Sequence, residues 1–254
     1  MKNIFFKLLL FSTLSFSISS CITHYIPPPV NNPMLSSESE IQVSASASMG
    51  TVTGMTNFNL AYSPIQHLGL GFTYNSYSAD LSTSTNGSSR TDKLYKGRYN
   101  ELLAGYYRGF AKHGLLELYT GMGIGSTDYN YVNYLNTNGS DGESKLSHYR
   151  IFLMPAVGFK FKNFQISYGL KLSRLNYYKI GTSNINNSFL LDEINDLGLS
   201  PFLFLDNAIT TKFGSKNLQA FIQLSTTTQV SGNFVTYDPT RLTLGLQFQF
   251  FAQP

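Results

Sequence analysis

Few residues in this chain of 254 have the types and spacing needed for catalysis. The best candidate is His148, which follows Asp141 and Glu143 in a polar stretch. A histidine beside carboxylates is the minimum needed to activate a water or a serine hydroxyl. Polar stretches often bring such residues together by chance, and no local hydrolase signature surrounds His148. We therefore expect that the protein is not an enzyme, with a hydrolase centred on His148 as an alternative.

Metal and cofactor chemistry has equally little support. The histidines are scattered along the chain instead of clustered: His24, His67, His113 and His148. Metal sites need clustered ligands, so no metal is expected. Gly121, Gly123 and Gly125 look like a phosphate-binding loop, but they continue the alternation of a strand, where glycine relieves crowding. No cofactor is expected.

The N-terminus has the features of a secretory signal. Lys2 and Lys7 flank the start of a short apolar run, and residues 1–20 end in two serines. Cys21 follows, and as the only cysteine it has no disulfide partner in the chain. Ile18-Ser19-Ser20-Cys21 resembles the lipobox of bacterial lipoproteins. The resemblance implies that Cys21 is acylated and becomes the mature N-terminus; the alternative is an ordinary signal with an incidental cysteine.

Residues 21–39 are expected to form an extended tether, because Pro27-Pro28-Pro29 and Pro33 favour polyproline II. Tyr25-x-Pro27 followed by Asn32-Pro33-Met34-Leu35 resembles the start of small outer-membrane barrel lipoproteins of the Bacteroidota. In that phylum, exported surface lipoproteins tend to carry acidic residues after the cysteine, and residues 22–26 have none. The resemblance implies an anchor in the periplasmic leaflet, joined by the tether to the base of the barrel. Whether the tether enters the lumen stays open.

The tether precedes a long region of alternating side chains. In the last segment Leu242, Leu244 and Leu246 share one face, and Arg241 and Gln247 lie on the other. Period-2 alternation predicts ten strands. Their ranges are 40–49, 54–63, 67–77, 98–110, 115–126, 147–161, 164–175, 199–213, 218–229 and 240–251.

Tight turns and longer links alternate between these segments, and long loops are expected at 78–97, 127–146 and 176–198. Short periplasmic turns and long outer loops are typical of outer-membrane barrels. Only 13% of residues are charged, about half the share in soluble domains. The sequence therefore predicts an all-β fold, a transmembrane antiparallel up-and-down barrel occupying residues 40–254. Eight strands are an alternative, and the rival fold is a soluble sandwich or lipocalin-like barrel with an apolar interior.

The parity of the strands also predicts which charged side chains line the lumen: Glu101, Arg150, Lys171, Asp206 and Arg241. Lys171 and Asp206 are expected at the same height on neighbouring strands, where they should pair. Glu101 is expected to meet Arg241 or Arg150. A buried charge is costly unless it is paired, so a structural network that plugs the barrel is favoured over a selectivity cluster in a channel.

Tyrosines at the outer ends of the strands have two interpretations. Tyr129, Tyr131, Tyr134, Tyr177 and Tyr178 are expected to form an aromatic girdle at the lipid headgroups. The alternative is stacking on a sugar or peptide ligand.

The function favoured by the sequence is that of an outer-membrane β-barrel lipoprotein with a structural or accessory role. A narrow channel and a hydrolase at the outer rim are the alternatives. The expected partners are outer-membrane lipids and a larger outer-membrane complex. Removing Lys2 and Lys7 with the signal changes the net charge from +4 to +2, and the mature chain has no basic run. Nucleic acid is therefore not an expected partner.

Overall fold

A computed structural model describes residues 23–251 except 52, 86–87, 132–141, 186–187 and 234. For residues 79–85, 88–95, 131, 189 and 190 only the backbone is described. The predicted signal peptide and Cys21 lie outside the described residues. No helix among the described residues is long and apolar enough to cross a bilayer.

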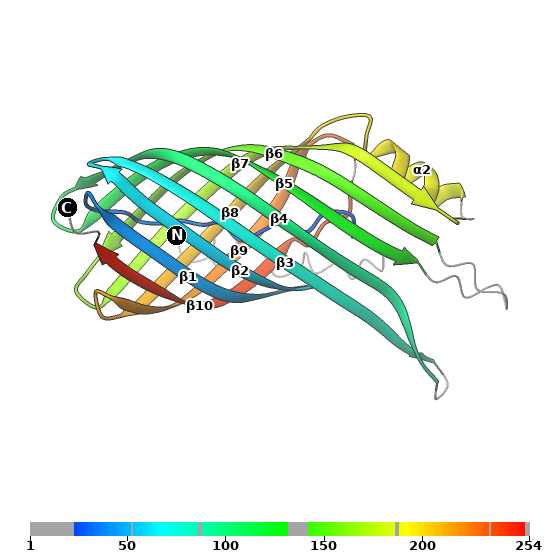
Figure 1. Ribbon diagram of the computed structural model, residues 1–254, viewed down its shortest axis with the longest axis horizontal. Coiled ribbons are helices and arrows are strands. Elements are labelled where there is room, and N and C mark those ends of the chain that lie inside the picture. Colours follow the sequence, from blue (N-terminus) through cyan, green and yellow to red (C-terminus); the bar gives the residue numbers. More distant parts are fainter. Residues whose placement is uncertain are drawn as a thin grey trace, which may run out of the picture.

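Ten antiparallel strands form one closed barrel, in which each strand pairs with its neighbours in sequence and β1 pairs with β10 (Figure 1). The strands are β1 Glu40–Gly50, β2 Gly54–Ile65, β3 Leu68–Thr85, β4 Ser88–Phe110, β5 Gly114–Tyr131, β6 Gly142–Lys160, β7 Phe164–Ser183, β8 Phe202–Gly214, β9 Leu218–Ser231 and β10 Thr240–Phe251. The predicted all-β barrel of ten strands is confirmed. The eight-strand alternative is wrong.

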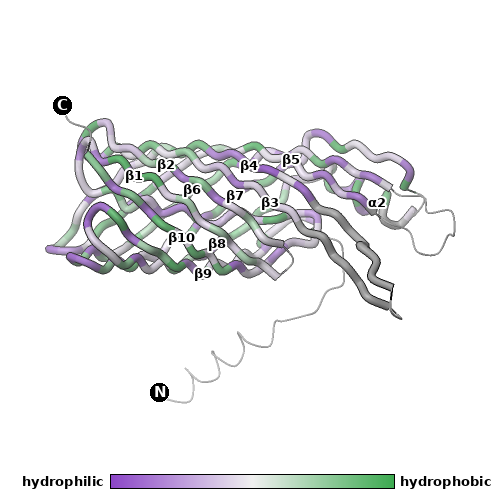
Figure 2. Tube along the Cα trace, turned by 60° about the horizontal axis from the view of Figure 1, so that its bottom comes forward, coloured by the Kyte–Doolittle hydropathy of each residue, from purple (hydrophilic) through white to green (hydrophobic). Residues whose placement is uncertain are grey.

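Among the described side chains of the strands, the exposed large apolar ones point outward, whereas the buried ones that point into the lumen are largely polar or aromatic. On β10, Leu244 and Phe248 are 55% and 51% exposed, whereas Thr243 and Gln247 are 1% and 5% exposed. The same alternation of hydropathy runs along the coloured parts of the other strands (Figure 2). A soluble sandwich or lipocalin-like barrel would bury the leucines, so that rival fold is wrong. An apolar surface that surrounds the whole barrel requires a lipid environment.

The two ends of the barrel differ. Four tight turns of two or three residues lie at one end, which we call the short-turn end: 66–67, 111–113, 161–163 and 215–217. β1 begins and β10 ends there, because Glu40 pairs with Phe251. The longer connections lie at the opposite, long-loop end, including the helix α2 (Ser188–Asp196) between β7 and β8 (Figure 1).

Several strands continue beyond the lengths that alternation predicted. β3 and β4 stay paired from Leu68 opposite Tyr106 to Thr85 opposite Ser88, so the predicted loop 78–97 is a hairpin. β5 and β6 pair as far as Tyr131 opposite Gly142, within the predicted loop 127–146. The error has a physical cause. A strand that has left the apolar layer needs no apolar face, so its serines, threonines and asparagines look like a loop.

Candidate functional site

Residues 23–35 lie inside the barrel, and we call them the lumen segment (Figure 1). All of residues 23–35 are buried except Pro29 and Asn31, which are half-buried. The apolar side chains of the lumen segment pack into small hydrophobic clusters spaced along the bore. Tyr25, Ile26, Val30, Met34 and Leu35 each belong to such a cluster.

The segment begins at the long-loop end. The backbone N–H groups of His24 and Tyr25 donate to the Thr236 carbonyl at 2.8 and 3.1 Å, and the Asp238 N–H donates to the Tyr25 carbonyl at 3.2 Å. Tyr25 also forms a parallel bridge with Tyr237. These partners lie in the link between β9 and β10, so the start of the segment is attached to a long-loop connection.

Two tyrosines reinforce this attachment from the barrel wall. The Tyr129 and Tyr177 hydroxyls donate to the His24 carbonyl at 2.8 and 2.9 Å. Both side chains are buried in the lumen. The predicted aromatic girdle is therefore wrong for these two residues, whereas Tyr178 is exposed on the outer surface. The side chains of Tyr131 and Tyr134 lie outside the described part of the chain.

An aromatic cluster surrounds Tyr25. Its ring lies 4.8 Å from that of Phe204 and 6.0 Å, edge-on, from that of His148. Ile194 of α2 and Leu197 just after it belong to the same cluster and are buried. The helix thus covers the long-loop end of the lumen, over the start of the segment.

The middle and the end of the lumen segment are also bonded to the wall. Gln223 Nε2 donates to the Val30 carbonyl at 2.7 Å. Near the short-turn end the Leu35 N–H donates to Glu117 Oε1 at 3.1 Å, and Lys160 Nζ donates to the Met34 carbonyl at 2.7 Å. The segment is therefore held along its whole length.

The residue types of the segment suit a narrow polar bore. Proline has no N–H group, so Pro27, Pro28, Pro29 and Pro33 bring no backbone donor that would need a partner in the lumen. Proline also restricts the unfolded chain, which reduces the entropy lost when the segment is ordered. An extended proline-rich stretch can therefore be buried at lower cost than an ordinary loop.

Glycines in the wall make room for the segment. A Cβ placed on Gly158 of β6 would overlap the Met34 side chain, and one on Gly169 of β7 would overlap Asn32. A Cβ on Gly69 of β3 would come within 3.0 Å of Leu35 Cδ1. These inward-facing glycines show that the wall is shaped around the lumen segment.

The direction of the segment differs from the expected tether. An extended tether that left the short-turn end for a periplasmic anchor was expected, but residues 23–35 run back through the bore to the long-loop end. The physical reason is that the segment carries five large apolar side chains, which are stabilised by burial. No helix forms between Thr23 and Leu35, as the prolines predicted.

The five charged residues predicted to line the lumen all point inward and are buried. Their partners differ from the expected ones. Lys171 lies opposite Asp206 in the ladder, yet its Nζ binds Glu101 Oε2 at 2.6 Å. Arg150 pairs with Asp206.

Arg241 pairs at 2.9 Å with Asp238, in the β9–β10 link. The other two pairs join strands that are not neighbours. Lys171 on β7 reaches Glu101 on β4, and Arg150 on β6 reaches Asp206 on β8. Both ion pairs therefore reach beyond the adjacent strand inside the lumen and close it further.

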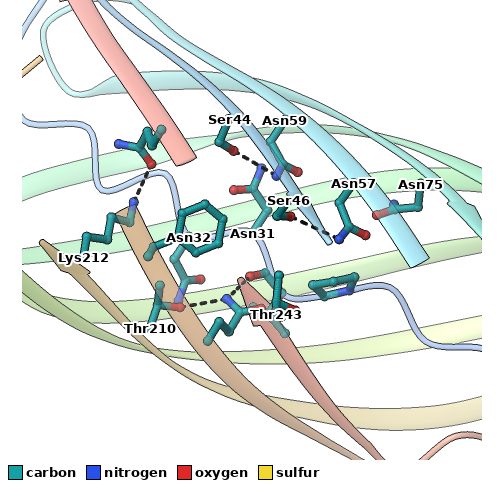
Figure 3. A pocket seen from close by; sticks show the side chains of 15 residues that line it. Asn31, Asn32, Ser44, Ser46, Asn57, Asn59, Asn75, Thr210, Lys212 and Thr243 are labelled. Atoms are coloured by element: carbon teal, nitrogen blue, oxygen red, sulfur yellow. Dashed lines mark hydrogen bonds between the residues drawn. The ribbon is translucent and has the colours of Figure 1, made fainter. Parts of the chain in front are cut away.

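A small polar cavity remains beside the lumen segment (Figure 3). Its volume is about 30 Å³, and Asn57, Asn75, Thr210 and Lys212 are among the residues that line it. Lys212 Nζ donates to Gln247 Oε1 at 2.8 Å. A water needs about 10–15 Å³, so the cavity has room for one or two waters beside this buried ammonium group. It is too small for a solute path.

His148 is not at an accessible rim. It is buried in the lumen, and its ring lies 5.9 Å from that of Tyr99, stacked, and 5.6 Å from that of Tyr177. Glu143 points away from it to the exterior, and Asp141 lies outside the described residues. The geometry therefore gives no support to a hydrolase centred on His148.

A closed antiparallel barrel with an apolar exterior, a polar interior and short turns at one end is a transmembrane β-barrel of the outer-membrane type. One solved structure with a TM-score of 0.50 agrees with this fold. The translocator domain of the autotransporter NalP from Neisseria meningitidis is 11% identical, with a TM-score of 0.50 over 83% of this chain and 88% of that one. The outer-membrane protease OmpT of Escherichia coli is 7% identical, with a TM-score of 0.46 over 83% and 95%.

The N-terminal barrel domain of OprF from Pseudomonas aeruginosa is 12% identical, with a TM-score of 0.34 over 85% of this chain and all of that one. At these identities the likeness concerns the fold alone. No protein-family model matches the chain, and no curated protein is significantly similar to it.

Proposed function

We propose that the protein is a closed outer-membrane β-barrel lipoprotein with a structural or interaction role, as expected for small barrel lipoproteins of the Bacteroidota. The observation that carries this proposal is the lumen segment. It fills the bore from Thr23 to Leu35 and is bonded to the wall at both ends. A barrel that is sealed in this way offers its outer surface and its loops to partners, not its interior.

The long-loop end is the part of the protein best suited to contact a partner. It carries α2 and the extended β3–β4 hairpin, which no membrane-spanning role requires. Leu199, three residues after the end of α2, is 76% exposed. We propose that this end faces the exterior and that a larger outer-membrane complex binds there.

Purification from native membranes tests the interaction. We expect one protein to copurify in stoichiometric amount and to be lost when Leu199→Asp is introduced at the long-loop end. Lys162→Asp, at an exposed turn of the short-turn end, is the matched control and should keep the partner. Loss of the partner with the control but not with the Leu199 variant would contradict the proposed surface.

Acylation is tested separately. The resemblance of residues 18–21 to a lipobox supports a lipid on Cys21. Radiolabelled palmitate should be incorporated into the wild-type protein and not into Cys21→Ser. Incorporation into both proteins would show that the lipid is attached elsewhere, which would contradict an anchor at Cys21.

Conductance separates the closed barrel from a narrow channel. In planar bilayers we expect no stepwise current from the wild-type protein, because the segment and the buried ion pairs fill the bore. A variant lacking residues 23–35 should give steps, and Lys171→Ala added to it should alter their size. Steps from the wild-type protein that Lys171→Ala changes would favour the channel.

A further inference from the structure

We infer that the mature N-terminus leaves the barrel at the long-loop end, so that acyl chains on Cys21 enter the lipid leaflet on that side. The presence of a lipid rests on the proposed acylation of Cys21. The side of the barrel at which the N-terminus leaves rests on the lumen segment alone. If the long loops face the exterior, the protein is anchored in the outer leaflet. The sequence pattern had favoured the opposite leaflet.

The lumen segment runs from the long-loop end towards the short-turn end. Its early residues, His24 and Tyr25, bond to the β9–β10 link and to tyrosines of β5 and β7. Its late residues, Met34 and Leu35, bond to Lys160 and Glu117 near the short turns. The chain therefore enters at the long-loop end and crosses the whole barrel before β1 begins.

Chain lengths keep Cys21 away from the short-turn end. The twelve residue steps from Thr23 to Leu35, at about 3.1 Å each, span roughly 37 Å, enough to cross an apolar band of about 25 Å. Cys21 precedes Thr23 by only two residues, which reach at most about 7 Å. While Thr23 to Tyr25 keep their positions, Cys21 cannot reach the leaflet at the short-turn end.

The residues at the start of the segment are firmly held. Thr23, His24 and Tyr25 are each no more than 2% exposed. Four hydrogen bonds tie the backbone of His24 and Tyr25 to Thr236, Tyr129 and Tyr177. Moving Cys21 to the other leaflet would break these bonds and withdraw the Tyr25 ring from its cluster.

Three epitope insertions in the acylated protein compare the two sides in intact cells. One epitope follows Ile22, one lies in the β5–β6 link within 132–141, and one follows Pro254. We expect the first to behave like the second, with both detected in intact cells and the third detected only after permeabilisation. An N-terminal epitope that behaves like the C-terminal one would overturn the inference.

The same experiment distinguishes failure of the proposed function. If the β5–β6 epitope is hidden in intact cells, the proposed orientation of the loops is wrong. The inference about the N-terminus is still tested in that case, because the N-terminal epitope behaves either like the β5–β6 epitope or like the C-terminal one.

A disulfide provides a test without an insertion that could displace the segment. Bridged strand residues have the Cα separation that a disulfide requires, so Tyr25→Cys with Tyr237→Cys should form a disulfide on oxidation. Tyr25→Cys with Lys162→Cys, at the short-turn end, should not. Mass spectrometry of the unreduced digest identifies the bridge, and absence of the first bridge in heat-modifiable, folded protein would overturn the inference.

Discussion

The buried ion pair between Lys171 and Glu101 helps to close the lumen. Both side chains are buried, and Glu101 also accepts a hydrogen bond from Tyr99 at 2.8 Å. Removing one member of a buried pair leaves an uncompensated charge, whereas replacing both with neutral groups is often well tolerated.

We therefore expect Lys171→Met alone to reduce the free energy of unfolding by about 3–5 kcal/mol. Lys171→Met combined with Glu101→Gln should recover most of that loss. The temperature at which the folded band disappears in heat-modifiability gels measures both. A double variant that loses as much as the sum of the two single variants would contradict the pairing.

His24 gives the long-loop end of the segment a dependence on pH. It lies beside the end of β5 beyond the apolar band, where the outward-facing residue is the charged Asp128. Burial lowers the pKa of His24 from its usual 6.5 to about 4, and neither ring nitrogen has a hydrogen-bond partner. A released segment binds the proton near 6.5, but the buried form binds it only near 4, so acid favours release. The stabilisation is complete above about pH 6.5 and is lost as the pH falls towards 4.

The yield of the disulfide between positions 25 and 237, in the variant with both cysteines, measures this release. We expect it to decrease between about pH 6.5 and 4 and to be flatter when His24→Gln is added. Glu193 Oε1 lies 3.5 Å from His24 Nδ1 and would partly stabilise the proton, so Glu193→Gln should steepen the decrease. A profile that His24→Gln leaves unchanged would assign the pH dependence to another group.

The inward direction of the charged side chains could be predicted from alternation, but their partners could not. Parity gives the face of a strand on which a residue lies, and register gives its neighbours on adjacent strands. The Lys171–Glu101 pair joins β7 to β4, with two strands between them. Such a contact depends on the width of the bore, which no local pattern contains.

Among the elements, the strands were predictable and the lumen segment was not. Leu242 to Phe248 on β10 show the alternation that places a strand between lipid and lumen. The stretch from Thr23 to Leu35 has no such period, because it contacts walls on all sides. One signal was available: glycines that face inward at neighbouring heights, Gly158 and Gly169, indicate that something other than wall side chains fills the bore.

Those glycines give a prediction at this scale. Gly169→Leu should collide with Asn32 and push the segment from its place, at a cost of about 1–3 kcal/mol for overpacking. Gly109→Leu on β4 is the matched control, because a Cβ there meets nothing closer than 3.8 Å. The disulfide between positions 25 and 237 should form less readily in the first variant and normally in the second. Equal yields would mean that Gly169 does not shape the path.

Helix α2 was missed for a related reason. Ser188–Asp196 lies in a stretch rich in asparagine and serine, and only its short apolar run marks it. Its Ile194 is buried against the cluster around Tyr25, a contact that exists only once the barrel and the lumen segment are in place. Tertiary packing, not local propensity, determines the helix.

For the whole molecule, the central claim is that alternate side chains face lipid while their neighbours face a filled lumen. The chain contains no tryptophan, so one introduced tryptophan reports on one position. Phe248 is 51% exposed on the outer surface of β10, whereas Phe221 of β9 lines the cavity in the lumen. Phenylalanine to tryptophan is a modest change at both sites.

The most direct test is therefore the fluorescence of Phe248→Trp and Phe221→Trp in bilayers containing brominated lipids. The account predicts strong quenching of the tryptophan at 248 and little quenching at 221. Equal quenching at both positions, or stronger quenching at 221, would contradict it.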